Sequence, residues 1–311
     1  MNSQFDHVEI LRKTESYPTH LSDGVSVFSG KQNNCVDKNL SNGVTYFYTA
    51  FAVYKNGQTG KITDESQGHV TPHTVSIYSH PDPFIDSVVS FTPLNPLSVF
   101  GGWNMPNIVL GAPMGGGNFA GSLDAVSLHA KVSEKPGAPG IYGGSIVLEF
   151  TDNIVVNQNG PDFTIFENAF RMGGTDGYWM EPATVEVSVD GIQFYRFPFD
   201  YVPHYNEDNS INLYHPFSYA KGFAGVKPVY SKNGSPDPTN PLVSGGDQFD
   251  LSDLSQKLSW IRYIRITSTG DNWLRDMNGD YVRHTNEAPS WGANGSGNSG
   301  FDLDAVSAIN Y

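Results

Sequence analysis

The sequence predicts an all-β protein, and three observations carry this prediction. The 311 residues include 33 Gly and 20 Pro, a density typical of a chain with many turns. Aromatic residues make up 13% and charged residues only 16%, which favours a folded chain over a disordered one. Residues 145–150 and 184–189 alternate apolar and polar side chains, the pattern of an antiparallel strand with one buried face.

The chain divides into two modules at a stretch that is rich in proline. Pro72, Pro81 and Pro83 interrupt any strand pattern, because proline cannot donate a ladder hydrogen bond and restricts the residue before it. We therefore expect one module over residues 1–72, a linker over 73–83 and a larger module over 84–311.

Strands are expected in the first module at residues 7–12, 25–28 and 44–54. The segment Leu40-Ser-Asn-Gly-Val-Thr-Tyr46, which runs into the long aromatic strand, resembles the corner between the fifth and sixth strands of a fibronectin type III domain. This resemblance implies that the Tyr46 hydroxyl bonds back to nearby backbone. A complete domain has about seven strands, whereas only about five fit here. We therefore expect a truncated fibronectin type III-like sandwich, from a fragment of a longer surface protein or a chain whose start is assigned too late.

The second module carries its own series of strand signals. Strands are expected at residues 84–91, 145–150, 163–166, 184–189, 260–266 and 303–309. Asp190-Gly191 predicts a tight hairpin turn, and residues 250–257 predict one short helix. Long loops are expected at about 101–120, 199–248 and 270–300, and loops of this length are often functional.

The pentapeptide Leu-Asp-Ala-Val-Ser occurs twice, at residues 123–127 and 303–307. We expect the two copies to form neighbouring strands of a jelly-roll-like antiparallel sandwich, which would bring Asp124 and Asp304 together. A chance recurrence of common strand residues is the alternative.

Acidic residues gather around the predicted strands and suggest a calcium site. Carboxylate oxygens are the hard ligands that Ca²⁺ prefers. The expected ligands are Asp124, Asp162, Glu167, Asp302 and Asp304. The loop at residues 276–280 partly resembles a calcium loop but lacks the spacing and the final Glu of an EF-hand. The alternative is that the acidic residues only serve turns, where Asp and Asn are favoured.

The order of motifs in the second module resembles a family of bacterial cell-surface domains of uncharacterised function. Three of these motifs are Val109-Leu-Gly-Ala-Pro113, Gly143-Gly-Ser-Ile-Val-Leu-Glu-Phe150 and Gly160-Pro-Asp-Phe-Thr-Ile-Phe-Glu-Asn168. The resemblance spans nearly all of residues 84–311. It implies a secreted or surface-anchored β-sandwich similar to galactose-binding-like and discoidin-like modules, without an established reaction or known catalytic residues.

Tryptophans in predicted loops are candidate contacts for a carbohydrate ligand. They are Trp103, Trp179, Trp273 and Trp291, and Tyr178 lies beside one of them. The alternative is that these large rings anchor long loops to the sandwich.

Composition excludes several classes of partner. The 18 basic and 32 acidic residues give a formal net charge of −14, which disfavours nucleic acid and anionic membrane surfaces. No apolar run is long enough to span a membrane, and the first residues lack the pattern of a signal peptide. The single cysteine, Cys35, excludes an intrachain disulfide and a cysteine-based zinc site.

These observations predict a non-catalytic, extracellular adhesion or ligand-binding module of a bacterial surface protein, stabilised by calcium. The expected ligand is a glycan or a host or surface protein, and other domains of a longer parent chain are further expected partners. No serine-hydrolase elbow, zinc-protease motif or phosphate loop is present. Two alternatives stay open, a structural spacer in a surface assembly and a carbohydrate-active hydrolase, which would need a pair of carboxylates facing a cleft.

Overall fold

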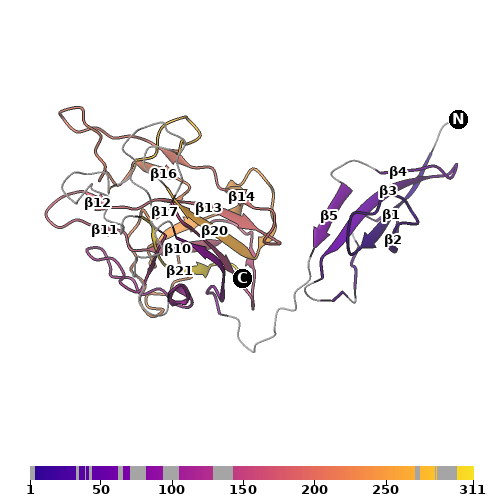
Figure 1. Cartoon of the computed structure of the whole chain (residues 1–311), viewed down its shortest axis with the longest axis horizontal. Coiled ribbons are helices and arrows are strands. Elements are labelled where there is room, and N and C mark those ends of the chain that lie inside the picture. The colour runs from indigo at the N-terminus through magenta and orange to yellow at the C-terminus, as the bar shows by residue number, and fades with distance from the viewer. Residues whose placement is uncertain are drawn as a thin grey trace. The chain divides into compact units, whose positions relative to one another are not determined.

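The computed structural model of the chain forms two compact units, Met1–Val75 and Ser76–Tyr311 (Figure 1). It describes residues 4–32, 35–38, 40–41, 44–61, 66–70, 82–93, 105–128, 143–269, 274–283, 285 and 300–311. The boundary at Val75 falls within the expected linker, but residues 71–81 lie outside the described residues. Each unit is described below by itself.

The first unit is one five-stranded antiparallel sheet in the order β2-β1-β3-β4, with β5 also paired to β3. The strands are β1 (Phe5–Lys13), β2 (Val25–Gly30), β3 (Tyr46–Tyr54), β4 (Thr59–Lys61) and β5 (Gln67–Val70). The long strand β3 is the centre of this sheet, because it pairs with β1 on one side and with β4 and β5 on the other. The three predicted strands of this module are confirmed.

The corner that precedes β3 has the predicted hydrogen bond. The backbone N–H of Ser41 donates to the Tyr46 hydroxyl at 3.0 Å, five residues upstream of the ring. The Arg12 guanidinium lies 5.1 Å from the centre of the same ring, and Leu11 of β1 and Phe51 of β3 are buried. The hydrogen bond expected of the Tyr46 hydroxyl is therefore confirmed.

The second unit contains two principal antiparallel sheets. The four-stranded sheet has the order β18-β10-β21-β7, and the six-stranded sheet has the order β14-β13-β20-β8-β6 with β17 added beside β13. The first contains β7 (Val126–Ser127), β10 (Phe163–Glu167), β18 (Asp247–Phe249) and β21 (Asp302–Ala308). The second contains β6 (Ser87–Thr92), β8 (Ser145–Glu149), β13 (Ala183–Ser188), β14 (Tyr195–Arg196), β17 (Phe223–Ala224) and β20 (Tyr263–Ser268).

Among its described residues the second unit also has three two-stranded ribbons. They pair β9 (Val155–Val156) with β19 (Trp260–Ile261), β11 (Phe170–Arg171) with β12 (Tyr178–Trp179), and β15 (Asp200–Tyr201) with β16 (Tyr219–Lys221). A hairpin joins β13 to β14 at the predicted place, with Gly191 at a φ of 73°, but its connection runs over residues 189–194 and is longer than the tight turn expected.

The two principal sheets share one hydrophobic core, so residues 76–311 form a β-sandwich. Ile146 and Leu148 of β8 and Ile264 and Ile266 of β20 pack in the same cluster as residues of the four-stranded sheet. These partners from the four-stranded sheet are Val126, Phe163, Ile165, Phe249, Leu303, Val306 and Ala308. Phe163 stacks on Phe249 with ring centres 5.2 Å apart.

The two copies of Leu-Asp-Ala-Val-Ser lie on neighbouring strands, as predicted. Asp302 pairs with Ser127, and Leu303 pairs with Val126, between β21 and β7. A register shift between β21 and β10 matches Phe166 to Ala305 and Glu167 to Leu303, so Asp304 has no partner in β10. Such an extra residue changes which face of a sheet the following side chains point to.

Three details differ from the sequence-based expectations. The segment expected to be a loop at residues 199–248 contains the short strands β15, β16 and β17. Strand β13 is buried on both faces, whereas alternation predicted one exposed face. Its acidic residue, Glu186, is accommodated because the Arg265 guanidinium lies 2.7 Å from the carboxylate. The helix expected at residues 250–257 is a single 3₁₀ turn, Leu251–Asp253, capped by the Asp250 side chain. Within the described residues there is no α-helix, and no helix there is long and apolar enough to cross a membrane.

Candidate functional site

A groove of about 630 Å³ lies on the second unit, between β16, the segment around Val226 and the loop before β18. It adjoins a smaller cavity of about 200 Å³, and Tyr219, Lys227 and Gln248 line both. The lining of the larger groove is mostly aromatic, proline and aliphatic: Tyr178, Pro216, Phe217, Tyr219, Ala220, Val226, Lys227, Pro228, Tyr230, Pro241, Leu242, Gly245, Gly246 and Gln248. A concave, largely apolar surface with a few polar groups is typical of a ligand site.

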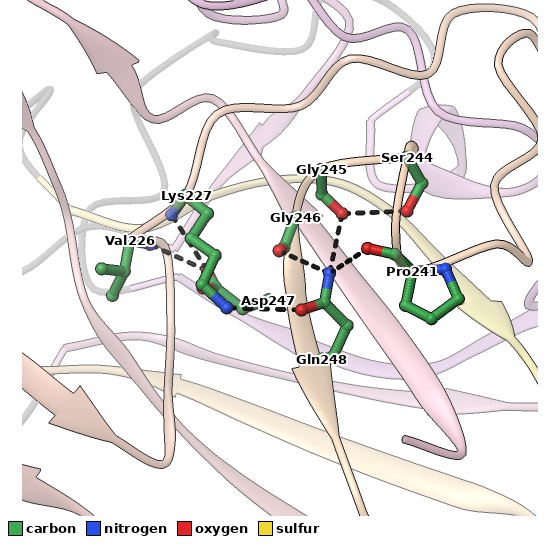
Figure 2. Close-up of polar contacts among 8 residues, drawn as sticks. All are labelled: Val226, Lys227, Pro241, Ser244, Gly245, Gly246, Asp247 and Gln248. Carbon is green, nitrogen blue, oxygen red and sulfur yellow. Dashed lines mark hydrogen bonds and ion pairs between the residues drawn. The ribbon is translucent and has the colours of Figure 1, made fainter. Parts of the chain in front are cut away.

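Gln248 lines this groove, and Figure 2 shows its polar contacts. Its Nε2 atom lies within hydrogen-bond distance of the backbone oxygens of Gly245 (3.2 Å), Gly246 (3.1 Å) and Pro241 (3.5 Å). Its Oε1 atom accepts a hydrogen bond from the Lys227 ammonium at 3.3 Å. One side chain therefore ties the loop of residues 241–246 to the opposite wall.

Asp247 lies behind the same wall and is buried. Its Oδ2 atom accepts the backbone N–H of Val226 at 2.8 Å, and the Lys227 ammonium lies 4.0 Å from Oδ1 (Figure 2). Burial raises the pKa of Asp247 to about 6, although Lys227 and the backbone donors act in the opposite direction. The carboxylate of Asp247, next to the groove, therefore takes up a proton at mildly acidic pH.

The rim of the groove is strongly apolar and exposed. Phe217 is 73% exposed, Tyr230 is 46% exposed and Leu242 is 91% exposed. Single exposed apolar side chains need no explanation, but several around one groove are typical of a contact surface.

The predicted tryptophan contacts do not form this groove in the described part of the chain. Trp179 is half-buried on β12 and stacks on Phe170 with ring centres 6.5 Å apart. Its neighbour Tyr178 lines the groove instead. Trp103, Trp273 and Trp291 lie outside the described residues, so their role as ligand contacts stays a prediction.

Two of the five predicted metal ligands lie together. Glu167 at the end of β10 and Asp302 at the start of β21 meet Glu181, which was not predicted. One carboxylate oxygen from each of the three lies within 4.8 Å of an oxygen of the others, and all three side chains are buried. Burial raises the pKa of Glu167 well above its ordinary range, and the nearby Glu181 and Asp302 raise it further.

The other three predicted ligands lie apart from this cluster. Asp162 is buried, and its oxygens accept hydrogen bonds from the backbone N–H groups of Gln158 and Leu251 (2.8 Å each) and from the Asn310 side chain (3.0 Å). Asp304 accepts the backbone N–H of Met114 at 3.0 Å, and burial raises its pKa to about 7. Asp124 is exposed, close enough to Asp304 to raise that pKa slightly.

The acidic loop at residues 276–280 is explained by turn chemistry. Asp276 accepts the backbone N–H groups of Tyr201, Asn278 and Asp280 at 2.8–2.9 Å. These are the local bonds for which Asp is favoured in turns. The alternative interpretation of this loop, stated from the sequence, therefore describes it well.

Sequence reasoning missed Glu181 and the groove. Glu181 precedes Pro182 and β13, where no acidic motif marks it, and only the fold brings it to Glu167 and Asp302. The groove is built from the long loop expected at residues 199–248, so the length of that loop was the available signal.

No protein-family model matches this chain, and a search of curated proteins also finds no match. The two family resemblances of the sequence therefore stay predictions.

Proposed function

We propose that residues 76–311 form a non-catalytic ligand-binding module that takes a carbohydrate in the groove beside β16. The observation that carries this proposal is the groove itself, with Tyr178, Phe217 and Tyr230 around a cavity of about 630 Å³. Aromatic rings stack on the C–H faces of sugar rings, which are apolar, while the sugar hydroxyls need polar partners near them. Lys227 and Gln248 supply polar groups between the two adjoining cavities.

The proposal includes the setting expected from the sequence. The first module is a partial fibronectin type III-like domain, and the second is a jelly-roll-like domain of a bacterial surface protein that acts outside the cell. The Tyr46 corner supports the former, and the pairing of β7 with β21 supports the latter. The net charge of −14 favours an uncharged ligand over a polyanion.

Two other functions receive less support from the described residues. A hydrolase would need two carboxylates facing the ligand, whereas no Asp or Glu lines the larger groove, and Asp247 and Asp253 line only the smaller adjoining cavity. A structural spacer would not need Phe217, Tyr230 and Leu242 exposed around a cavity.

Glycan-array binding by the full chain tests the proposal. We expect one class of glycan to bind, with at least a tenfold loss of affinity in Phe217→Ala and Tyr230→Ala. Tyr205→Ala is the matched control, because Tyr205 is 61% exposed and does not line the groove. The proposal is overturned if no glycan binds, or if the two groove variants bind as tightly as the control.

A further inference from the structure

We propose that Glu167, Glu181 and Asp302 form a buried binding site for a divalent cation of the hard, oxygen-seeking class, with Ca²⁺ as the expected ion. The three carboxylates come from the end of β10, the residue two positions before β13, and the start of β21. They are 1%, 3% and 6% exposed, so the site lies beneath the surface. The proposal does not depend on the groove binding a glycan.

Each carboxylate of the site is held in place by a hydrogen bond to one of its oxygens. The backbone N–H of Asp302 donates to Oε1 of Glu167 at 3.1 Å, and that of Gly300 donates to Oε1 of Glu181 at 2.8 Å. The side-chain amide of Asn168 donates to Oδ2 of Asp302 at 3.0 Å. Each of the three carboxylates therefore has one oxygen fixed by a neighbour.

Two carboxylate oxygens of the cluster accept no hydrogen bond from the described residues, and this observation points to a bound ligand. Oε2 of Glu167 is buried and has no hydrogen-bond partner among the described residues, and Oδ1 of Asp302 has none either, although the Ser127 hydroxyl lies close enough to the Asp302 carboxyl to lower its pKa. A buried polar atom without a partner is costly, so such atoms are expected to face an ion or a water. Within the same residues, no Lys, Arg or His forms an ion pair with Glu167 or Asp302.

The spacing and the chemistry of the donors favour Ca²⁺. Two oxygens that share a Ca²⁺ ion at about 2.4 Å lie at most about 4.8 Å apart, and the three carboxylates meet this limit. Ca²⁺ takes six to eight oxygen ligands and accepts bidentate carboxylates, whereas Zn²⁺ prefers nitrogen and sulfur. Three carboxylates supply up to six oxygens, and a cation also offsets their mutual repulsion.

The packing around the cluster keeps its shape. Only glycine fits at position 121, because a Cβ there would clash with the backbone oxygen of Asn168. Asn168 is the residue whose side-chain amide donates to Asp302. The backbone N–H of Glu181 donates to the oxygen of Gly225 at 3.2 Å. The backbone of Glu181 and the backbone beside Glu167 are therefore each in close contact with a neighbouring segment.

The test is thermal unfolding of the metal-stripped full chain at pH 7.5, without and with added Ca²⁺. Tryptophan fluorescence is the signal that monitors unfolding. All five tryptophans lie in residues 76–311, so this signal follows that unit. At a Ca²⁺ concentration of a hundred times Kd, we expect Tm to rise by about 5–10 °C. Equilibrium dialysis should find close to one Ca²⁺ per chain at the same concentration.

The variants separate this site from other acidic residues. Glu181→Gln and Asp302→Asn should lose the bound ion and the rise in Tm. Asp162→Asn is the matched control, because Asp162 is an equally buried carboxylate whose oxygens are hydrogen-bonded elsewhere. This control should begin at a lower Tm and still gain the full rise.

Two results would overturn the proposal. One is dialysis that finds no bound ion in the wild-type chain with any of Ca²⁺, Mg²⁺ or Mn²⁺, which would assign protons or water to the cluster. The other is an equal Ca²⁺ response in wild type and Glu181→Gln, which would place the ion elsewhere. Because dialysis counts ions directly, variants that fold poorly do not decide the outcome.

Discussion

The backbone N–H of Asp302 donates to the Glu167 carboxylate at 3.1 Å, although 135 residues separate the two along the chain. This bond places the carboxylates of two acidic residues close together in the buried interior, where their negative charges repel each other. The arrangement is the basis of the first prediction.

Glu167→Gln should lower the melting temperature Tm only when calcium is present. Without a cation, removal of one of three buried like charges should raise Tm at pH 7.5 or leave it unchanged. With saturating Ca²⁺, the same variant should melt several degrees below wild type because a ligand is missing. Melts in EDTA and in Ca²⁺ check this, and a variant less stable by the same amount in both would contradict it.

Asp162 should matter for stability whether or not calcium is present. Its carboxylate accepts the backbone N–H groups of Gln158 and Leu251 and the side-chain amide of Asn310, all in a buried place. Asp162→Ala leaves these donors without partners and should cost about 2–4 kcal/mol of unfolding free energy. Urea unfolding in EDTA and in Ca²⁺ measures this cost, and a dependence on Ca²⁺ would instead make Asp162 a metal ligand.

Asp247 should make the protein less stable as the pH rises from 4 to 7. Its folded pKa is about 6, raised by burial from an ordinary 3.8, so the folded state binds the proton more tightly. The stabilisation is fully present below about 3.8 and is lost as the pH rises through 6, which amounts to about 3 kcal/mol.

Asp247→Asn isolates this contribution. An asparagine can still accept the backbone N–H of Val226 but does not titrate. The difference in unfolding free energy between wild type and the variant should therefore shift by about 2 kcal/mol between pH 4 and pH 7, most of the full effect. If the unfolding free energies of wild type and variant instead change with pH in parallel, the pKa of Asp247 is not raised and the prediction is wrong.

Tyr46→Phe should weaken the first unit only. The Tyr46 hydroxyl accepts the backbone N–H of Ser41 at 3.0 Å, and the ring itself is buried. Loss of the hydroxyl should cost about 1 kcal/mol. Amide hydrogen exchange should be faster in β3, while Trp fluorescence, which follows residues 76–311, should give an unchanged melt. A change in that melt would contradict the assignment.

The two proposed sites should be coupled. The backbone N–H of Glu181 donates to the oxygen of Gly225, and the next residue, Val226, lines the groove and donates to Asp247. Chelation of the cation should loosen this connection and weaken glycan affinity by about twofold to tenfold. Glu181→Gln should bind as weakly as the chelated wild type and should not respond to EDTA. Equal affinity with and without EDTA in the wild type would show that the sites act independently.

Local patterns in the sequence were enough to predict most of the elements. Alternation of apolar and polar residues identified β8, and the Asp190-Gly191 pair identified the turn after β13. The segment before Tyr46 predicted a hydrogen bond that the structure contains. Each of these signals lies within about ten residues, where backbone geometry depends mainly on the local sequence.

The candidate sites depend on relationships that no local pattern carries. Glu167, Glu181 and Asp302 meet only because the fold brings the end of β10 to the starts of β13 and β21. The register shift opposite Asp304 decides which side chains of β21 face the core. The groove likewise needs Gln248 to reach the carbonyls of a loop that no periodicity describes. The sequence by itself therefore determined the strands and many of the turns, because these follow from short-range sterics and burial. Tertiary structure alone decided which polar groups are buried together, because strand register and loop packing set those distances.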